Sequence, residues 1–131
     1  MRFTLTTNME RMTPREDMGA VLRHVTRMAE MADEGGFDII WAAEHHAIET
    51  TIGPAPFQLL AHFANHTYRI RLGTGVVVAP YWHPVKLAGE AALLDWISNG
   101  RLEFGIGRGA YQREFDRMAD GIDQKVGGPM M

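Results

Sequence analysis

The feature that most constrains the fold of this chain is a regular alternation of strand-like and helix-like patterns. Short apolar or β-branched runs predict four strands, about one every 30 to 35 residues, at 2–7, 37–43, 70–80 and 101–106. Apolar residues at three- and four-residue steps predict helices between them, at 18–32, 57–65 and 84–98. Because strands joined by such helices pair in parallel, the pattern predicts repeated βαβ units on one sheet.

Two α/β architectures contain such units: a doubly wound open sheet and the (β/α)₈ TIM-type barrel. The chain has 131 residues, whereas a complete barrel needs roughly 250. In the barrel interpretation, residues 1–131 are one domain that holds only the first half of the barrel, about four βα units. Residues 119–131 form a poorly defined tail with little apolar periodicity and no closing helix, which favours a truncated barrel.

Composition and charge narrow the partners that we expect. Hydrophobic residues make up 46% of the chain and charged residues 22%, as in ordinary soluble globular proteins. The formal net charge is −3 without a basic stripe, and no segment resembles a secretory signal or a membrane span. We therefore expect neither nucleic acid nor a membrane as a partner. The absence of cysteine excludes thiolate metal ligands and fits a reducing, cytoplasmic location.

Chemically useful side chains gather in the segments that follow the predicted strands. In both architectures the functional site lies at the carboxyl ends of the strands. The segments at these ends contain three of the six histidines and an arginine between two glycines. We therefore expect these four side chains to lie at one end of the sheet: His45, His46, His83 and Arg108.

The triplet Glu44-His45-His46 directly follows the second predicted strand. If strand alternation continues, His46 points to the same side as Glu44 and His45 to the other, so one metal ion would not easily bind both imidazoles. His45 is then either a general acid or base, since imidazole titrates near neutral pH, or a structural group bonded to backbone. His62 and His66 have the spacing of a helical zinc motif without its glutamate, which indicates a solvated or capping role. We predict no metal site.

The segment GIGRGAY, residues 105–111, brings three glycines beside Arg108. Glycines let the backbone approach a ligand closely, and a guanidinium matches a phosphate. The spacing differs from the dinucleotide-binding fingerprint and follows the fourth strand rather than the first, so an anion site and a tight turn both stay open. Tyr81, Trp82 and Phe104 fit either a pocket for a flat ring or ordinary core packing.

The order of several short motifs carries a family resemblance. The stretches GFDIIWAAEHH and IRLGTGVVVAPYWHPVKLAGEAALLDWISNGRLEFGIGRGAYQREF contain H-P-V, L-L-D, S-x-G-R, F-G-I-G-R-G and Y-x-x-E-F in this order. Over residues 1–118 the chain resembles the N-terminal half of the bacterial luciferase-like flavin-dependent monooxygenases. The resemblance implies the (β/α)₈ barrel, of which this chain holds the first half.

The resemblance also implies a function. Members of this family bind reduced FMN, or the deazaflavin F420 in some branches, across the carboxyl ends of the strands. They use dioxygen to oxidise an aldehyde or a similar small organic substrate. A separate flavin reductase supplies the reduced cofactor, and relatives commonly pair their barrels, which implies a homo-oligomer.

The same resemblance implies roles for particular residues. His45 matches the family's candidate catalytic base near the flavin, and Glu44 and His46 match neighbours that orient it. Arg108 matches the arginine that contacts the flavin phosphate.

The residues expected at the flavin itself follow from the same motifs. Gly75 and Val76 match a non-proline cis peptide beneath the flavin ring, and Gly107 and Tyr111 lie in the motifs around the phosphate-binding arginine. Luciferase α-subunits have a reactive cysteine at the position of Gly107, so we expect a general monooxygenase rather than a light-emitting enzyme. Because half of the barrel is absent, a catalytically silent flavin-binding or fragment protein is the alternative. A metal-dependent barrel hydrolase using the histidine pair is a third hypothesis.

Overall fold

The first three helices alternate with strands in the order that the sequence pattern predicts. A computed structural model describes residues 1–128. Its elements are, in chain order, β1 (Thr4–Thr7), α1 (Met18–Glu34), β2 (Ile39–Ala42), α2 (Pro56–Ala64), β3 (Arg71–Thr74), β4 (Val77–Val78), the 3₁₀ turn η1 (Ala79–Tyr81), α3 (Pro84–Ile97), β5 (Leu102–Glu103), β6 (Ile106–Gly107), α4 (Gln112–Met118) and the 3₁₀ turn η2 (Gln124–Val126).

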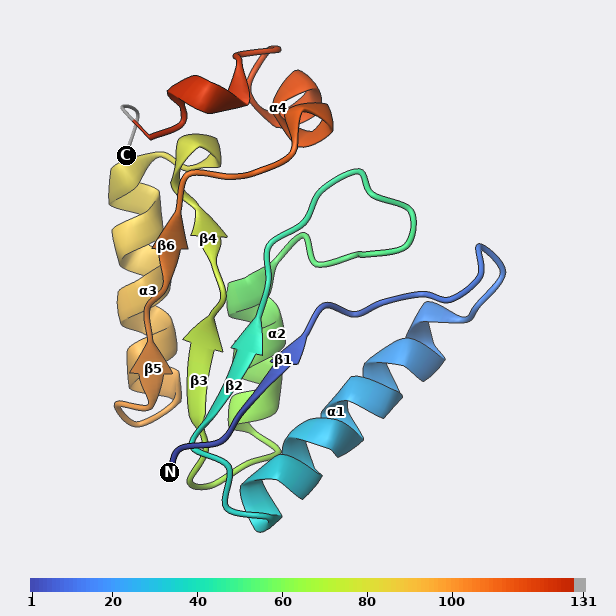
Figure 1. The fold of residues 1–131 in the computed structure, drawn as a ribbon. Helices are drawn as coiled ribbons and strands as arrows, with labels where there is room; N and C mark the ends of the chain where they lie inside the picture. Colours follow the sequence, from blue (N-terminus) through green and yellow to red (C-terminus); the bar gives the residue numbers. More distant parts are fainter. Residues whose placement is uncertain (129–131) are drawn as a thin grey trace.

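The strands pair in parallel, as the helical connections require. The main sheet has the order β1-β2-β3-β5, and the short strands β4 and β6 pair beyond the carboxyl ends of β3 and β5. Helices α2 and α3 lie behind the sheet in Figure 1. Helix α1 covers the same face, because its residues Val25 and Ala29 share one core with α2 and α3. A doubly wound sheet carries helices on both faces, whereas a barrel carries them only on its outside. The fold is therefore the first half of a (β/α)₈ barrel, which confirms the predicted fold class.

Local sequence signals explain where the helices begin and end. The carboxylate of Asp17 accepts hydrogen bonds from the backbone amides of Gly19 (3.1 Å) and Ala20 (3.0 Å), which caps α1. Pro56 and Pro84 are the first residues of α2 and α3, where the missing N–H removes no hydrogen bond. None of the helices within residues 1–128 combines the length and apolar character that crossing a membrane requires.

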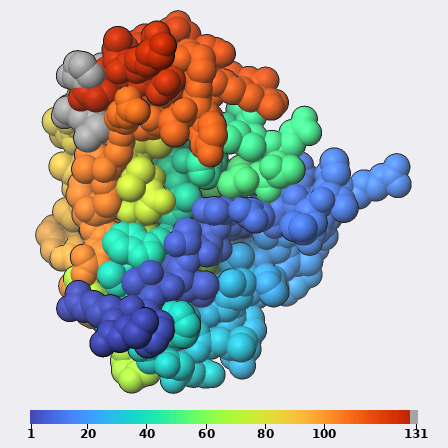
Figure 2. Space-filling model, viewed as in Figure 1, coloured from blue at the N-terminus to red at the C-terminus, as the bar shows by residue number. Residues whose placement is uncertain are grey.

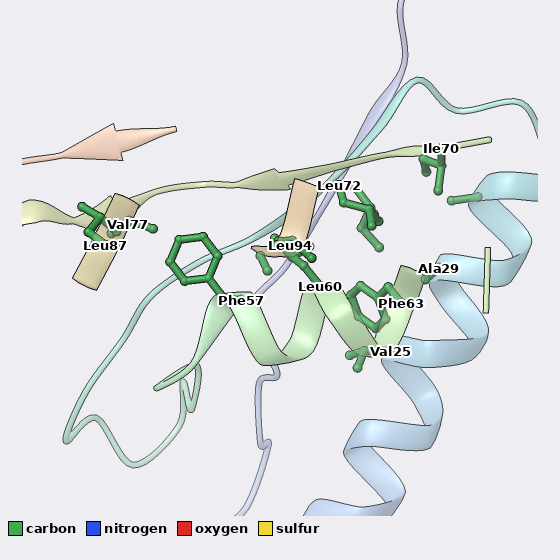
Figure 3. Packing of buried hydrophobic residues seen from close by; sticks show 13 residues of the cluster. Val25, Ala29, Phe57, Leu60, Phe63, Ile70, Leu72, Val77, Leu87 and Leu94 are labelled. Atoms are coloured by element: carbon green, nitrogen blue, oxygen red, sulfur yellow. The ribbon is translucent and has the colours of Figure 1, made fainter. Parts of the chain in front are cut away.

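The core lies between the sheet and its three helices. Ile40 and Leu72, on the two central strands, are fully buried in one cluster with Leu60 and Phe63 of α2. Figure 3 shows Leu72 beside these two side chains. Side chains of the two flanking helices complete this layer: Val25, Ala29, Leu87 and Leu94. Burial of one such large apolar side chain contributes roughly 1.5 to 3 kcal/mol, so this layer holds the helices on the sheet.

Two predicted strands, at 70–80 and 101–106, are each divided in two, and the prediction of continuous strands is wrong there. Between β3 and β4 the Gly75–Val76 peptide bond is cis. The hydroxyl of Thr74 donates to the carbonyl of Gly105 (2.8 Å) and accepts from its amide (2.9 Å), so a side chain replaces the backbone ladder at the break. A Cβ on Gly105 would lie 2.1 Å from the carbonyl oxygen of Thr74, so this approach requires glycine.

The face of the sheet that the helices leave open would line the interior of a complete barrel. Side chains alternate along a strand, so Thr6, Trp41 and Glu103 share this face, one register position away from the core residues. The Trp41 ring covers Gly73, where an added Cβ would lie 2.2 Å from a ring carbon. Figure 2 views this face, and atoms of the strands lie at its surface without a covering helix.

Helix α4 is not predicted by the sequence pattern, yet it closes one end of the molecule. Phe115 of α4 is fully buried and its ring packs against Tyr81, with centroids 5.1 Å apart. This contact places α4 beyond the carboxyl ends of the strands (Figure 1). The predicted tail, 119–131, contains the turn η2, and its residues 129–131 lie outside the described part of the chain.

Candidate active site

The segment after β2 carries the first group of candidate residues. Nε2 of His46 lies 2.8 Å from Oε1 of Glu44, on one side of the segment. His45 turns to the other side, where its Nδ1 lies 3.2 Å from Oε1 of Glu114. The predicted alternation is confirmed, and it separates the two imidazoles. Within residues 1–128, no three histidine, cysteine or acidic side chains gather closely enough to hold a metal ion.

Glu44 is a buried anchor. The residue is 3% exposed, and its carboxylate accepts hydrogen bonds from the backbone amide of Val78 (2.6 Å) and from Nε1 of Trp82 (2.9 Å). Together with His46, these partners satisfy a carboxylate that would be costly to bury alone. Glu44 therefore joins the end of β2 to β4 and to the loop before α3.

Glu114 of α4 is the carboxylate that contacts His45, and it lies outside the residues predicted from the sequence. It is 1% exposed and accepts a hydrogen bond from the backbone amide of His46 (2.7 Å). A carboxylate beside Nδ1 of His45 favours the tautomer that carries its proton there, which leaves Nε2 as the acceptor. Glu114 thus contacts His45 in the way that the resemblance implies for Glu44. The sequence signal for it is the acidic residue of the Y-x-x-E-F motif.

Three aromatic residues pack near the site: Tyr81, Trp82 and Phe104. The hydroxyl of Tyr81 is buried and has no hydrogen-bond partner within residues 1–128. Burial, followed by the negative charges of the two buried glutamates, raises the pKa of Tyr81 well above its ordinary value, so the phenol stays protonated.

Trp82 packs edge-on against Phe57 at 5.6 Å, and Phe104 stacks on the same ring at 6.4 Å between centroids. These contacts favour core packing over a separate aromatic pocket.

A cavity of about 250 Å³ lies beside His45, at the carboxyl ends of the strands. Its wall includes Gly75, Val76 and Tyr111. The cis peptide at Gly75–Val76 is the one that the resemblance implies. The rings of His45 and Tyr111 are 5.7 Å apart, on one side of this backbone. A stretch of backbone beside two rings can accept a flat heteroaromatic molecule.

Gly107 and Arg108 lie at the end of β6, next to this cavity but outside its wall. A Cβ on Gly107 would lie 2.5 Å from Cγ2 of Val76, so glycine allows β6 to pack against the cis peptide. Arg108 is exposed, and within residues 1–128 its guanidinium makes no hydrogen bond or ion pair. Its donors are therefore free to bind an anion.

The remaining histidines lie away from this cavity. His83 is exposed and directly precedes α3. Nε2 of His62 lies 2.9 Å from Oγ1 of Thr26, across the packing of α2 on α1, which differs from the solvated or capping role that the sequence indicates. Burial, and then the neighbouring His66, lower the pKa of His62 below its ordinary value.

Known proteins are similar to this chain in sequence. The oxygenase component of the flavin-dependent trigonelline monooxygenase of Acinetobacter baylyi is 51% identical over 123 residues, which cover 94% of this chain and 34% of that protein. The chain thus spans about a third of the length of this relative.

Solved structures extend the similarity to three dimensions. The monooxygenase RslO1 of Streptomyces bottropensis superposes with a TM-score of 0.89 at 36% identity, over 99% of this chain and 39% of that one. The oxygenating constituent of 3,6-diketocamphane monooxygenase from Pseudomonas putida, solved with FMN, gives a TM-score of 0.82 at 29% identity, over 88% and 32%. The F420-dependent tetrahydromethanopterin reductase of Methanopyrus kandleri gives 0.70 at 26% identity, over 90% and 30%.

The family assignment follows from these similarities together with the order of motifs along the chain. The model of the family described as luciferase-like monooxygenase matches residues 1–128, which is nearly the whole sequence. The chain therefore belongs to the luciferase-like monooxygenase family.

Proposed function

We propose that the protein is the oxygenase of a flavin-dependent monooxygenase, which uses reduced FMN and dioxygen to oxidise an aldehyde or a similar small organic substrate. A separate flavin reductase supplies the reduced cofactor, and the Acinetobacter relative, an "oxygenase component", supports this division of labour. A cytoplasmic location and a homo-oligomeric state are part of the proposal.

The observation that carries the proposal is the pair formed by His45 and Glu114 at the edge of the cavity beside the Gly75–Val76 peptide. A general base needs a fixed orientation and access to the reacting group. The buried carboxylate of Glu114 supplies the orientation, and the cavity supplies the access. In this arrangement Nε2 of His45 is the atom that holds or moves a proton.

The residues present fit a flavin. The backbone of Gly75 and Val76 offers a flat surface for the ring system, Tyr111 borders it, and Arg108 has free donors for the phosphate. Reduced FMN, when bound there, supplies the electrons that activate dioxygen. The protein's own contribution is to bind the ring and the phosphate and to keep His45 oriented.

Anaerobic titration of a form of the protein that contains a complete barrel, first with reduced FMN and with reduced F420 and then with oxygen and an aldehyde, tests the proposal. We expect binding of reduced FMN and oxygen consumption that depends on the aldehyde. Binding of F420 alone would favour an F420-dependent oxidoreductase of the same family. Binding without turnover would favour the catalytically silent flavin-binding protein, and binding of neither cofactor would contradict the proposal.

A further inference from the structure

A second cavity borders the histidine pair and, apart from His45, shares no residue with the cavity of the proposed flavin site. Its volume is about 380 Å³, and it lies between α4 and the loop that follows β2. The side chains of His45 and His46 form part of its wall, so its contents would lie next to the proposed base.

The cationic side of this cavity comes from α4. Arg113 and Arg117 are four residues apart and therefore lie on the same face of the helix. Within residues 1–128 neither forms an ion pair, whereas Arg23, Arg27 and Arg71 each have a carboxylate partner. Nη1 of Arg117 donates to the carbonyl of Ala47 (3.2 Å), which holds its guanidinium against the loop. Two like charges at this spacing repel, and a bound anion would relieve the repulsion.

The opposite wall of the cavity is apolar, and the loop that forms this wall is closed by a backbone hydrogen bond. Ile48, Ile52 and Pro54 line it. The loop that carries them closes on itself through the amide of His45, which donates to the carbonyl of Gly53 (2.9 Å). A wall fixed in this way suits the apolar body of a small molecule better than a fully hydrated ion.

The charges that face the cavity favour an anion. Glu49 is the one carboxylate in the wall, and the guanidinium of Arg11 donates to its backbone carbonyl (3.1 Å), so a third cation lies close by. Glu44 and Glu114 lie behind the imidazoles, where buried hydrogen-bond donors already occupy them.

We propose that this cavity binds the anionic end of the substrate, a carboxylate carried on a small apolar body. The carboxylate would lie between Arg113 and Arg117, and the apolar body against Ile48 and Ile52. This inference rests on the proposed function in one respect, since it is the proximity to His45 that makes the bound molecule a substrate.

Benzoate and benzamide are suitable probes, because they differ in charge and hardly in shape. Calorimetric titration of the protein with each should show that benzoate binds about 10- to 100-fold more tightly, as charge-assisted hydrogen bonds require. Equal affinities, or no binding of benzoate, would overturn the proposal.

Substitutions of the two arginines on α4 test where benzoate binds. Arg113→Gln and Arg117→Gln should each weaken benzoate binding about tenfold or more and leave benzamide unchanged. Arg117→Lys should keep part of the affinity, since it retains the charge and loses the planar fork. Arg23→Gln, an exposed arginine on α1, is the matched control and should bind benzoate like the unmodified protein. Equal losses in the control and in the α4 variants would refute the assignment.

The experiments distinguish failure of the proposed carboxylate site from failure of the proposed flavin-dependent function. The benzoate titration needs no flavin, and reduced FMN can be titrated into the same variants. Loss of selectivity for benzoate with intact FMN binding would reject only the carboxylate site. Selective benzoate binding without FMN binding would reject only the proposed flavin-dependent function.

Discussion

At the scale of single residues, each of two adjacent imidazoles contacts its own buried carboxylate. Glu44 holds His46 together with the backbone of β4, whereas Glu114 contacts His45 from a helix 69 residues away in sequence. Adjacent histidines on a strand end face opposite ways, so each needs its own partner. The two imidazoles therefore have different surroundings, and the proposal gives the proton-handling role to His45 alone.

Substitution of Glu114 tests this division. Glu114→Gln keeps the size and the hydrogen bond to the His46 amide but removes the charge that fixes the His45 tautomer. We expect kcat to fall on the order of 10- to 100-fold, with the Kd for reduced FMN unchanged. Stopped-flow turnover and flavin titration measure the two quantities. Asp116→Asn, an exposed carboxylate on the same helix, is the control; an equal loss of kcat in both variants would reject the positioning role.

Arg108 gives a second prediction at this scale. Arg108→Gln removes an exposed guanidinium that is free to bind a phosphate, so we expect FMN affinity to fall about 10- to 100-fold. Riboflavin lacks the phosphate, so its affinity should not change. Fluorescence titration with both flavins decides the matter, and a parallel loss for both would show that Arg108 acts on the ring site instead.

At the scale of elements, glycines set how closely neighbouring strands approach. Gly105→Ala should destabilise the protein by about 3 kcal/mol, since the added methyl would overlap the carbonyl oxygen of Thr74. Gly89→Ala, where an added Cβ meets nothing within 4 Å, should stabilise helix α3 by roughly 0.5 to 1 kcal/mol. Urea denaturation of the two variants should therefore give shifts of opposite sign. Shifts of the same sign would contradict this account of the strand break.

Asp33, near the end of α1, ties that helix to the start of β3. Its carboxylate accepts from the backbone amides of Tyr68 (2.9 Å), Arg69 (2.9 Å) and Ile70 (2.6 Å). Burial acts to raise the pKa of Asp33, but these three amides lower it by more, so the pKa lies below its ordinary value.

The lowered pKa of Asp33 makes its contribution to stability dependent on pH. The contribution is fully present above the unfolded-state pKa, about 3.9, and is lost as the pH falls through the lower pKa of the folded state. Asp33→Asn should cost about 1 to 3 kcal/mol at neutral pH and less in acid. Denaturation from pH 7 to pH 2 measures the difference. Glu34→Gln, its exposed neighbour, should show no such change, and a constant difference for Asp33→Asn would refute the assignment.

At the scale of the whole molecule, the sheet is covered on one face only. The inner face carries Trp41 and the ion pair between Arg71 and Glu103. In complete barrels the loops after strands 7 and 8 frequently supply a phosphate site. Under the proposed function, the described residues would supply the backbone surface at Gly75 and Val76 and, through Arg108, part of the phosphate contacts.

This incompleteness predicts how the 131 residues behave alone. We expect the isolated segment to bind reduced FMN at least about 100-fold more weakly than a protein with a complete barrel, and to bind a hydrophobic dye at its open face. Flavin titration and dye fluorescence on both proteins provide the measurement. Equal FMN affinity would show that the half barrel is sufficient.

The sequence by itself determined the order of the elements, the parallel pairing and the end of the sheet where the polar residues gather. These features follow from local patterns, because hydrophobic periodicity and connection length act over a few tens of residues. The alternation of Glu44, His45 and His46 follows from strand geometry in the same way.

The tertiary structure decided which groups meet across long stretches of chain. The division of the third and fourth strands depends on the approach of Gly105 to Thr74, and the partner of His45 depends on where α4 packs. Both are contacts between residues more than 30 positions apart. No local periodicity encodes such contacts, because the position of a short helix like α4 is set by the burial of Phe115 and Glu114 against the rest of the fold.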